Sequence, residues 1–448
     1  MSTITQNERL AKIPLTQLER AIEQFVEPVS QQLPDKRLKS VISLAVRGIS
    51  AAQSPLITQM ARALHRHQER VWALSKRFSG FLANKRFSSA TLLKGLYTLA
   101  QRSVEQQQPE MLVVAIDPVN FEKPYTHKLP GVSTVHTSTP PALNGKARLT
   151  RGYPAITAAV TNLAVPVITY ANWFSYTLDF VSQNGEIEQA IENTHALFPH
   201  LPLCLLGDSG LDDQKFFHLV QSLPATDCIF RAQHQRCIQV YNERGDRWEE
   251  ERLFDLAAYA ALPFHFQTTF THARKLHGVS FHLGWFQIRF ADLPRPMWAL
   301  IARRTDADSG SALEEGELVL LSPIPIPDAK TAQRVYNQWR QRPRIEHTYR
   351  FDQEQGLDVE DMRVRSLEAM RRLFVLVLLT ALFVAFLDAT WPQSAVDWLR
   401  SLGGKLDLKT DLDGLYLLLA GISFIFPTAA TLSFACSHPF PFSSFTSG

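Results

Sequence analysis

MLVVAID, at residues 111–117, is the stretch of sequence that decides the fold. Its six consecutive apolar residues are typical of a short strand buried on both faces, and therefore of a central position in a sheet. Asp117 follows them directly, and Pro118 has no backbone N–H to donate to a neighbouring strand. We expect the strand to end at Asp117 and to leave this carboxylate at the edge of the sheet. The alternative is an aspartate that only closes a turn.

The residues that follow predict a mixed α/β domain, because strand composition alternates with a helical pattern. The expected elements are a proline-rich loop at 124–149, strands at 153–163 and 165–173, a turn at Asn184-Gly185, a helix at 186–198 and a strand at 202–206.

Asp208 closes the apolar run LCLLGD in the same way as Asp117 closes the first strand. Asp212 and Asp213 lie one turn further on and are its rivals for a functional role. We prefer Asp208 because it alone follows a strand directly, although an aspartate at this position can also cap a helix or close a turn.

Glu346 lies in a basic and aromatic stretch, YNQWRQRPRIEHTYRFDQEQGLDVEDMRVR, at residues 336–365. Pro343 suits the first position of a new helix and disfavours helical backbone at the residue before it. Glu346 would then lie in the first helical turn, where the helix dipole favours a negative charge. The alternative is a solvated amphipathic helix with surface ion pairs. The residues expected to share a face with Glu346 are Tyr349, Arg350 and Gln353.

This stretch resembles the glutamate-bearing helix of DDE insertion-sequence transposases. That family has an aromatic residue seven positions before its glutamate, an arginine four before and a lysine seven after. Here these positions hold Trp339, Arg342 and Gln353, so the arginine matches, the aromatic character is kept and the lysine is replaced. The resemblance covers roughly residues 111–387.

The resemblance implies an α/β fold with an RNase H-like mixed sheet flanked by helices, a β-rich insertion and a helical N-terminal domain. In an RNase H-like core the first and fourth strands are neighbours, so Asp117 and Asp208 would come together despite the 91 positions between them. With Glu346 they would be the catalytic residues and would bind two Mg²⁺ (or Mn²⁺) ions. Ser209 departs from the family, in which arginine often follows the second aspartate.

The function that the resemblance implies is a DNA transposase, which catalyses metal-dependent phosphodiester cleavage and strand transfer at element ends. Arg342 and Arg350 would bind DNA phosphate near the site, with Trp339 alongside. The expected partner is double-stranded DNA, at element ends and target, bound by a homodimer in the cytoplasm and associated with the nucleoid, not with a membrane. Two alternatives are an RNase H-like nuclease without strand transfer and an inactive relic that only binds DNA.

The 138 positions between Asp208 and Glu346 are more than an RNase H-like core needs. The family often carries a strand-rich insertion here, and segments such as VSFHLGWFQIRF and MWALIARR have strand composition. Trp285 and Trp298 are expected to be core aromatics. The alternative is that one of them stacks on a displaced base, as an insertion aromatic does in some relatives.

Cysteine and histidine spacing gives no sign of a metal site. The four cysteines form no CxxC pair and show no zinc-ligand spacing, which predicts buried free thiols in a reducing compartment. His265, His272, His277 and His282 also lack a repeated ligand spacing.

The charge of the chain is unevenly distributed. Residues 36–102 hold thirteen Lys and Arg against one acid, Glu69, a balance of +12, whereas the whole chain carries +3 and the remainder therefore −9. Such a basic segment indicates a polyanionic partner. We expect a helix-turn-helix bundle that binds DNA phosphates; the alternative is a helical cap with a solvated basic face. The expected phosphate contacts are Arg62, Arg66, Arg70, Lys76 and Arg77.

Two apolar segments follow the glutamate stretch. Residues 373–387 make only ~22 Å of helix, short of the ~30 Å hydrocarbon core, which favours a buried helix over the sheet. Residues 414–448 contain no Lys, Arg, Asp or Glu, and we expect them to pack on the protein or a partner, with a membrane segment as the alternative. The expected domains are a helical basic N-terminal domain at 1–107, the two parts of the core at 108–225 and 328–390, the insertion at 226–327 and the tail at 391–448.

Overall fold

The apolar run at the start of β1 (Leu112–Glu122) lies at the centre of the sheet in this computed structural model. On one side β5 (Leu203–Gly207) pairs with it in parallel, and on the other β3 (Leu149–Val160) pairs with it antiparallel. Residues 112–116 are all buried, as expected for a strand covered on both faces. The expectation that the two strands leading to Asp117 and Asp208 are neighbours is confirmed.

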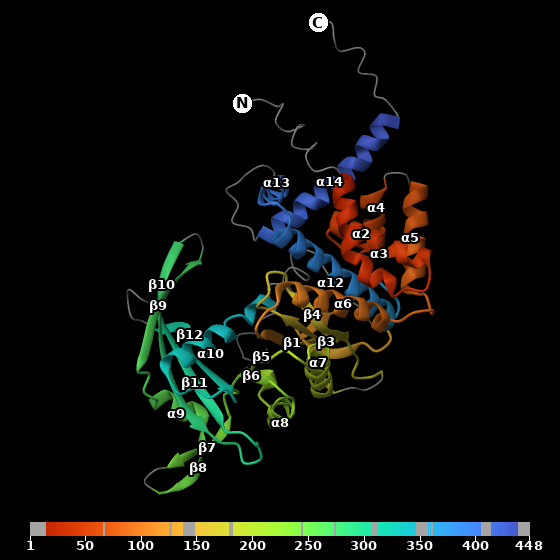
Figure 1. Cartoon of the computed structure of the whole chain (residues 1–448). Helices are drawn as coiled ribbons and strands as arrows, with labels where there is room; N and C mark the ends of the chain where they lie inside the picture. Colours follow the sequence, from red (N-terminus) through yellow and green to blue (C-terminus); the bar gives the residue numbers. More distant parts are fainter. Residues whose placement is uncertain are drawn as a thin grey trace.

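The structure describes residues 15–65, 68–124, 128–137, 148–178, 182–242, 245–272, 275–306, 312–345, 357, 359, 362–404 and 414–437. In this part of the chain a large mixed sheet is flanked by helices, as the sequence predicted (Figure 1).

The expected end of β1 at Asp117 is wrong, because the strand continues through Pro118 to Glu122. The register explains why proline is tolerated. Thr161 donates its N–H to the carbonyl of Val113, and Lys123 donates its N–H to Arg151, so the odd-numbered residues of β1 bond to β3. The nitrogen of Pro118 therefore faces the β5 side, where the pairing has already ended at Ile116 and Gly207. Its missing N–H removes no bond from the ladder.

Ten strands of the described chain form this sheet in the order β2-β3-β1-β5-β6-β12-β11-β10-β9, with β4 also paired to β3. The expected boundary at 225/226 falls just before β6, which pairs in parallel with β5, so strands on both sides of it belong to one sheet. The remaining strands are β2 (Ser133–His136), β4 (Val167–Trp173), β6 (Thr226–Arg231), β9 (Phe264–His272), β10 (Lys275–Ile288), β11 (Met297–Asp306) and β12 (Ala312–Ser322), and a separate hairpin of β7 (Cys237–Asn242) and β8 (Arg247–Arg252).

Strand periodicity divides the core into two layers, since successive side chains point to opposite faces. Along β1, Val113 and Ala115 belong to one apolar cluster, and Val114 and Ile116 belong to the other. The first cluster is covered by α6 (Ser89–Gln107), α10 (Ala329–Trp339) and α12 (Leu367–Thr390), and the second by α7 (Gln183–Leu197), α8 (Gln214–Ser222) and α9 (Leu253–Tyr259) (Figure 1). Trp285 and Trp298 pack against the first cluster, as expected of core aromatics.

The N-terminal segment is helical, as expected, and α12 packs against it on one side and against the sheet on the other (Figure 1). The polar stretch SVEQQQPE at 103–110 has the composition of a linker, but residues 103–107 form the end of α6. Asn184-Gly185 likewise lies inside the first turn of α7, where the Ser182 hydroxyl accepts a hydrogen bond from Gly185 N–H. The first helices are α2 (Leu15–Gln31), α3 (Lys36–Ala52), α4 (Ile57–Leu64) and α5 (Gln68–Leu82).

The expected burial of the apolar helix over the sheet is confirmed, although α12 has 24 residues and not fifteen. Its sequence-based bounds were too narrow because its first turns carry charged residues that are themselves bonded inside the protein. In the described chain, α12 is long and apolar enough to cross a membrane by length and composition, and 78% of its apolar window is buried inside the protein. The bent pair α3 and α4 meets the same criterion only if taken as one span.

After α12 the chain forms α13 (Gln393–Gly403) and α14 (Gly414–Ser437), which pack closely together. A Cβ atom at Gly421 would lie 2.0 Å from the Leu399 carbonyl oxygen, so only glycine allows this approach. Leu418 and Ile422 of α14 are buried, which agrees with a tail packed on the protein. Among the cysteines, Cys204 and Cys228 are buried free thiols, whereas Cys237 is exposed, contrary to the expected burial.

Candidate active site and nucleic-acid interface

Asp117 and Asp208 are brought together by the register of two parallel strands. The last pair of the β1–β5 ladder is Ile116 with Gly207, and the two aspartates are the next residue on each strand. Asp117 is nearly buried, with 14% of its side chain exposed, and Asp208 is half-buried with 40% exposed. The strand register thus places two carboxylates, 91 positions apart in sequence, at one point on the sheet.

Arg342 bridges these two carboxylates. Its Nη2 lies 3.0 Å from Asp117 Oδ1 and 3.7 Å from Asp208 Oδ2. The two oxygens are therefore no further apart than the sum of these distances, 6.7 Å. Arg342 lies in a tight turn that follows the end of α10 at Trp339, and helical backbone resumes at Pro343, as the sequence predicted.

A positive charge already lies between the two aspartates in the form of the Arg342 guanidinium. Carboxylate oxygens are also the ligands that Mg²⁺ prefers. Asp117 and Asp208 therefore fit as two of the three ligands in the metal site that the resemblance implies. No group of three or more His, Cys, Asp or Glu that could hold a metal occurs among the described residues. Glu346, the predicted third ligand, lies outside the described residues, as does Arg350.

Asp208 also caps the short helix η1 (Ser209–Leu211). Its Oδ1 accepts a hydrogen bond from Ser209 N–H at 2.8 Å. The same oxygen lies 3.8 Å from Arg231 Nη1 on β6. The cap proposed as its alternative role is thus present, while Oδ2 still faces Arg342.

The two rival aspartates serve the local structure. Asp212 is buried, pairs with Arg236 at 2.7 Å and accepts the N–H of Gln233 at 2.7 Å. Burial raises the pKa of its carboxyl group, against the opposing effect of the hydrogen bond from Arg236. Asp213 caps α8 by accepting the N–H of Lys215. Neither faces Arg342, which supports the choice of Asp208.

Trp339 lies at the end of α10, half-buried against the first apolar cluster. Its indole Nε1 is buried and has no hydrogen-bond partner among the described residues. Trp339 is therefore a packing residue of the apolar core, and direct contact with DNA stays a prediction.

Part of the charge of the basic segment lies where α3, α5 and the loop after α5 meet. Arg77 on α5 donates a hydrogen bond to the Ser40 hydroxyl on α3, and Arg86 in the loop after α5 pairs with Asp35, the N-cap of α3. We call the exposed cations gathered here the basic face; they are Lys36, Arg37, Lys76, Arg77, Lys85 and Arg86.

Only Lys76 and Arg77 of this face were among the predicted DNA contacts. Arg62 and Arg70 are exposed on α4 and α5, and Arg66 lies outside the described residues. Lys36 and Lys85 were missed because the selection followed single helices. The charge count over residues 36–102 already contained them, and that count was the signal that could have found them.

The chain has a distant structural likeness to known proteins. No family model matches it, and no curated protein matches it. Among solved structures, the cryo-EM structure of a piggyBac transposase synaptic complex with hairpin DNA aligns with a TM-score of 0.43 and 9% sequence identity. The alignment covers 94% of this chain and 82% of that chain. A likeness at this level carries no argument about fold or function.

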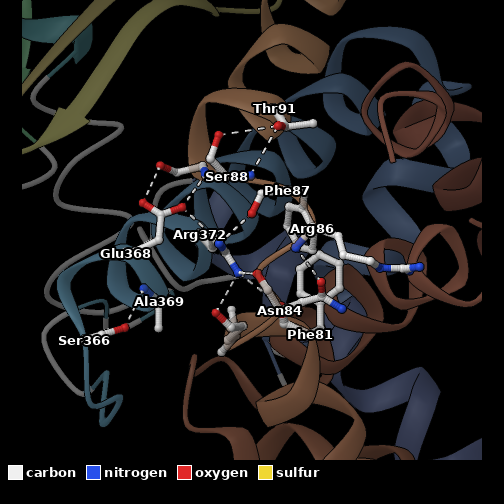
Figure 2. Close-up of polar contacts among 12 residues, drawn as sticks. Phe81, Asn84, Arg86, Phe87, Ser88, Thr91, Ser366, Glu368, Ala369 and Arg372 are labelled. Carbon is white, nitrogen blue, oxygen red and sulfur yellow. Dashed lines mark hydrogen bonds and ion pairs between the residues drawn. The ribbon is translucent and has the colours of Figure 1, made fainter. Parts of the chain in front are cut away.

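The loop that carries Lys85 and Arg86 is held from α12 by the buried guanidinium of Arg372, which pairs with the half-buried Glu368 (Figure 2). Arg372 is 6% exposed, and its Nη1 donates to the carbonyl oxygens of Leu82 at 2.9 Å and Asn84 at 2.5 Å. Its Nη2 donates to the Phe87 carbonyl at 2.6 Å, and the guanidinium lies 4.5 Å from the Phe87 ring centroid. The carbonyl oxygen of Leu82, at the C-terminal end of α5, has no partner within its own helix and accepts a hydrogen bond from this cation. A positive charge at the C-terminal end of a helix is also favoured by the helix dipole.

Glu368 completes this arrangement at the other end of the loop. It accepts hydrogen bonds from the N–H of Ser89 at 2.6 Å and the Ser89 hydroxyl at 3.0 Å, at the start of α6 (Figure 2). A carboxylate at a helix N-terminus is favourable for the same electrostatic reason. Glu368 also pairs with Arg372 at 3.0 Å, so one turn of α12 fixes both ends of residues 83–88.

Proposed function

We propose that this protein is a DDE-type DNA transposase of the insertion-sequence class, which cleaves phosphodiester bonds at element ends and joins them to target DNA. The observation that carries the proposal is the meeting of Asp117, Asp208 and Arg342. The arginine belongs to the stretch that resembles the family's glutamate helix, and it contacts both predicted catalytic aspartates.

The strand order supports an RNase H-like core for the proposed enzyme. The order β4-β3-β1-β5-β6, with β3 antiparallel to β1 and with β5 and β6 parallel to it, agrees with the arrangement that the resemblance implies. This topology brings together the ends of β1 and β5, which correspond to the first and fourth strands of the RNase H-like core. The proposed chemistry requires their two aspartates to be close.

Phosphodiester cleavage at neutral pH requires an activated nucleophile and stabilisation of the charge that develops on the phosphate. Two Mg²⁺ or Mn²⁺ ions, held by Asp117, Asp208 and Glu346, would activate water and stabilise the leaving oxygen. Arg342 is placed to bind a non-bridging phosphate oxygen, because its guanidinium lies beside both aspartates and has donors in a planar fork. The freed 3′-hydroxyl would serve as the nucleophile for strand transfer at the same site.

The proposed partner is double-stranded DNA, which the basic face would bind through phosphates. We further propose that a homodimer acts on the paired ends, and that the protein works in the cytoplasm in association with the nucleoid.

A second candidate is a protein that binds DNA ends without cutting them. One observation favours it, since Arg342 already pairs with both aspartates and would have to yield part of this contact to a metal ion. A third candidate is an RNase H-like nuclease without strand transfer, and an assay must distinguish it from the first two.

The test is an assay on supercoiled plasmid that carries the DNA flanking this gene, with Mg²⁺ or Mn²⁺ added. The wild type should nick the plasmid and join ends, and Asp117→Asn should reduce nicking by about 100-fold or more, because metal-bound carboxylates support several kcal/mol of charge stabilisation. Asp213→Asn is the matched control and should keep full activity. Binding without nicking by the wild type would establish the non-cutting alternative, and nicking without joining would establish the nuclease.

A further inference from the structure

Trp72 is an exposed aromatic side chain on α5, beside the basic face. It is 63% exposed, and the ammonium of Lys76 lies 3.5 Å from its ring centroid. A tryptophan is among the largest apolar side chains and is on average well buried in folded proteins. Packing in the core therefore does not explain why a tryptophan is found at this position.

The helix itself shows that Trp72 does not serve the core. The buried residues of α5 are Leu74, Phe78, Phe81 and Leu82, and at 100° per residue this stripe is centred about 135° around the helix from Trp72. Removing the indole would leave that apolar stripe intact.

The surroundings of Trp72 suit a flat, negatively charged ligand. Lys76 lies one turn further along the same face, and beyond it Gly80 has no atom within 4 Å of the position a Cβ would take. Arg77 lies about 140° around the helix from Trp72 and instead donates a hydrogen bond to Ser40 on α3. The arrangement at Trp72 thus combines an exposed aromatic ring, one cation on the ring and free space along the helix.

We propose that Trp72 stacks on an unpaired base of DNA, while Lys76 binds an adjoining phosphate. In a duplex the bases are stacked on one another and present only their edges, so an indole ring has no free base face to cover. Sites for single-stranded nucleic acid combine aromatic rings with a cationic groove in this way. The proposal rests on the DNA-binding half of the proposed function and deepens it, because it names DNA with unpaired nucleotides, such as a frayed or single-stranded end, as the preferred ligand.

The test compares the full-length wild type with Trp72→Ala and Trp72→Phe for binding to a fluorescent 20-mer of dT and to a duplex of equal length. Trp72→Ala should weaken binding to dT by about 5- to 150-fold, the range for loss of one stacked base, and should change duplex binding little. Trp72→Phe should lie between, since a smaller ring still stacks. The control is Tyr259→Ala, which removes an aromatic that is 92% exposed on α9, away from the basic face; it should change neither affinity.

Equal losses on dT and duplex, or no loss on dT, would overturn the stacking role. The plasmid assay keeps this result separate from the proposed function. If the wild type nicks flanking DNA while dT binding is independent of Trp72, only the stacking proposal fails. If dT binding depends on Trp72 but the wild type never nicks, the stacking proposal stands and the transposase proposal fails.

Discussion

Replacing Arg372 by leucine tests how the loop at residues 83–88 is held in place. Leucine fits an apolar helix such as α12 but has no donors. The substitution leaves the carbonyl oxygens of Leu82, Asn84 and Phe87 without their partner, and it leaves Glu368 half-buried without its cation. The perturbation is thus confined to one side chain whose partners are all known.

The expected magnitude follows from these contacts. A buried polar group left without its hydrogen bond costs about 1–3 kcal/mol. Glu368 is half-buried and keeps its hydrogen bonds from Ser89, so the cost comes from the carbonyl oxygens of the loop. Three carbonyls lose their partner and water reaches some of them, which gives a total of about 3–5 kcal/mol. The free energy of opening residues 83–88 should therefore fall by about 3–5 kcal/mol, which corresponds to about 150- to 5,000-fold faster exchange.

Native-state hydrogen–deuterium exchange followed by mass spectrometry measures this opening directly, without requiring the whole chain to unfold reversibly. Peptides that cover residues 83–92 should exchange faster in Arg372→Leu, whereas those from β10 and β11 should not change. Arg365→Met is the matched control, since Arg365 is exposed and its loss should change local stability by less than about 0.5 kcal/mol. Exchange within tenfold of the wild type in Arg372→Leu would refute the view that this guanidinium secures the loop.

Three further predictions concern catalysis, binding and pH. Glu346→Gln should keep DNA affinity while abolishing metal-dependent nicking, and equal nicking by the variant and the wild type would exclude a catalytic role. Combined Arg77→Glu and Arg86→Glu should weaken duplex binding and lower the slope of log affinity against log salt by about 1 for each lost phosphate contact; an unchanged slope would place the DNA elsewhere. Burial raises the pKa of Tyr336 from 10.0 to about 12, so the unfolded chain ionises first and the folded state loses stability as the pH rises from 10 through 12. Tyr336→Phe should remove up to about 3 kcal/mol of that loss, and identical alkaline unfolding of both proteins, followed by circular dichroism, would contradict the burial effect.

Much of the sheet could be predicted because its signals are local. An apolar run such as residues 112–116 carries its own evidence of burial on both faces, and Asp208 follows its strand as directly as expected. The extension of β1 past Pro118 could not be predicted, because it depends on which neighbour each N–H faces, and that is set by the register with β3 and β5.

The arrangement around the candidate site was only partly visible in sequence. Proximity of Asp117 and Asp208 required a fold, which the resemblance supplied, and the contact with Arg342 followed from neither composition nor spacing. The contacts of Arg372 could not be predicted from the sequence, because its partner Phe87 is 285 positions away. An arginine near the start of an apolar helix does not by itself indicate any particular contact. Side chains that satisfy distant carbonyls leave no periodic pattern.

The position of α12 has a consequence for where DNA would be cut. Arg372 holds the loop with Lys85 and Arg86, and two residues later Phe374 packs at 5.4 Å against Phe121, on the same strand as Asp117. If the protein is the transposase proposed above, this one helix would set the separation between the DNA backbone bound at the basic face and the phosphate to be cut. We therefore expect the cut to fall at a constant number of base pairs from the bound DNA segment, and a spacer of a few base pairs inserted between them to shift the cut in sequence while this distance stays the same.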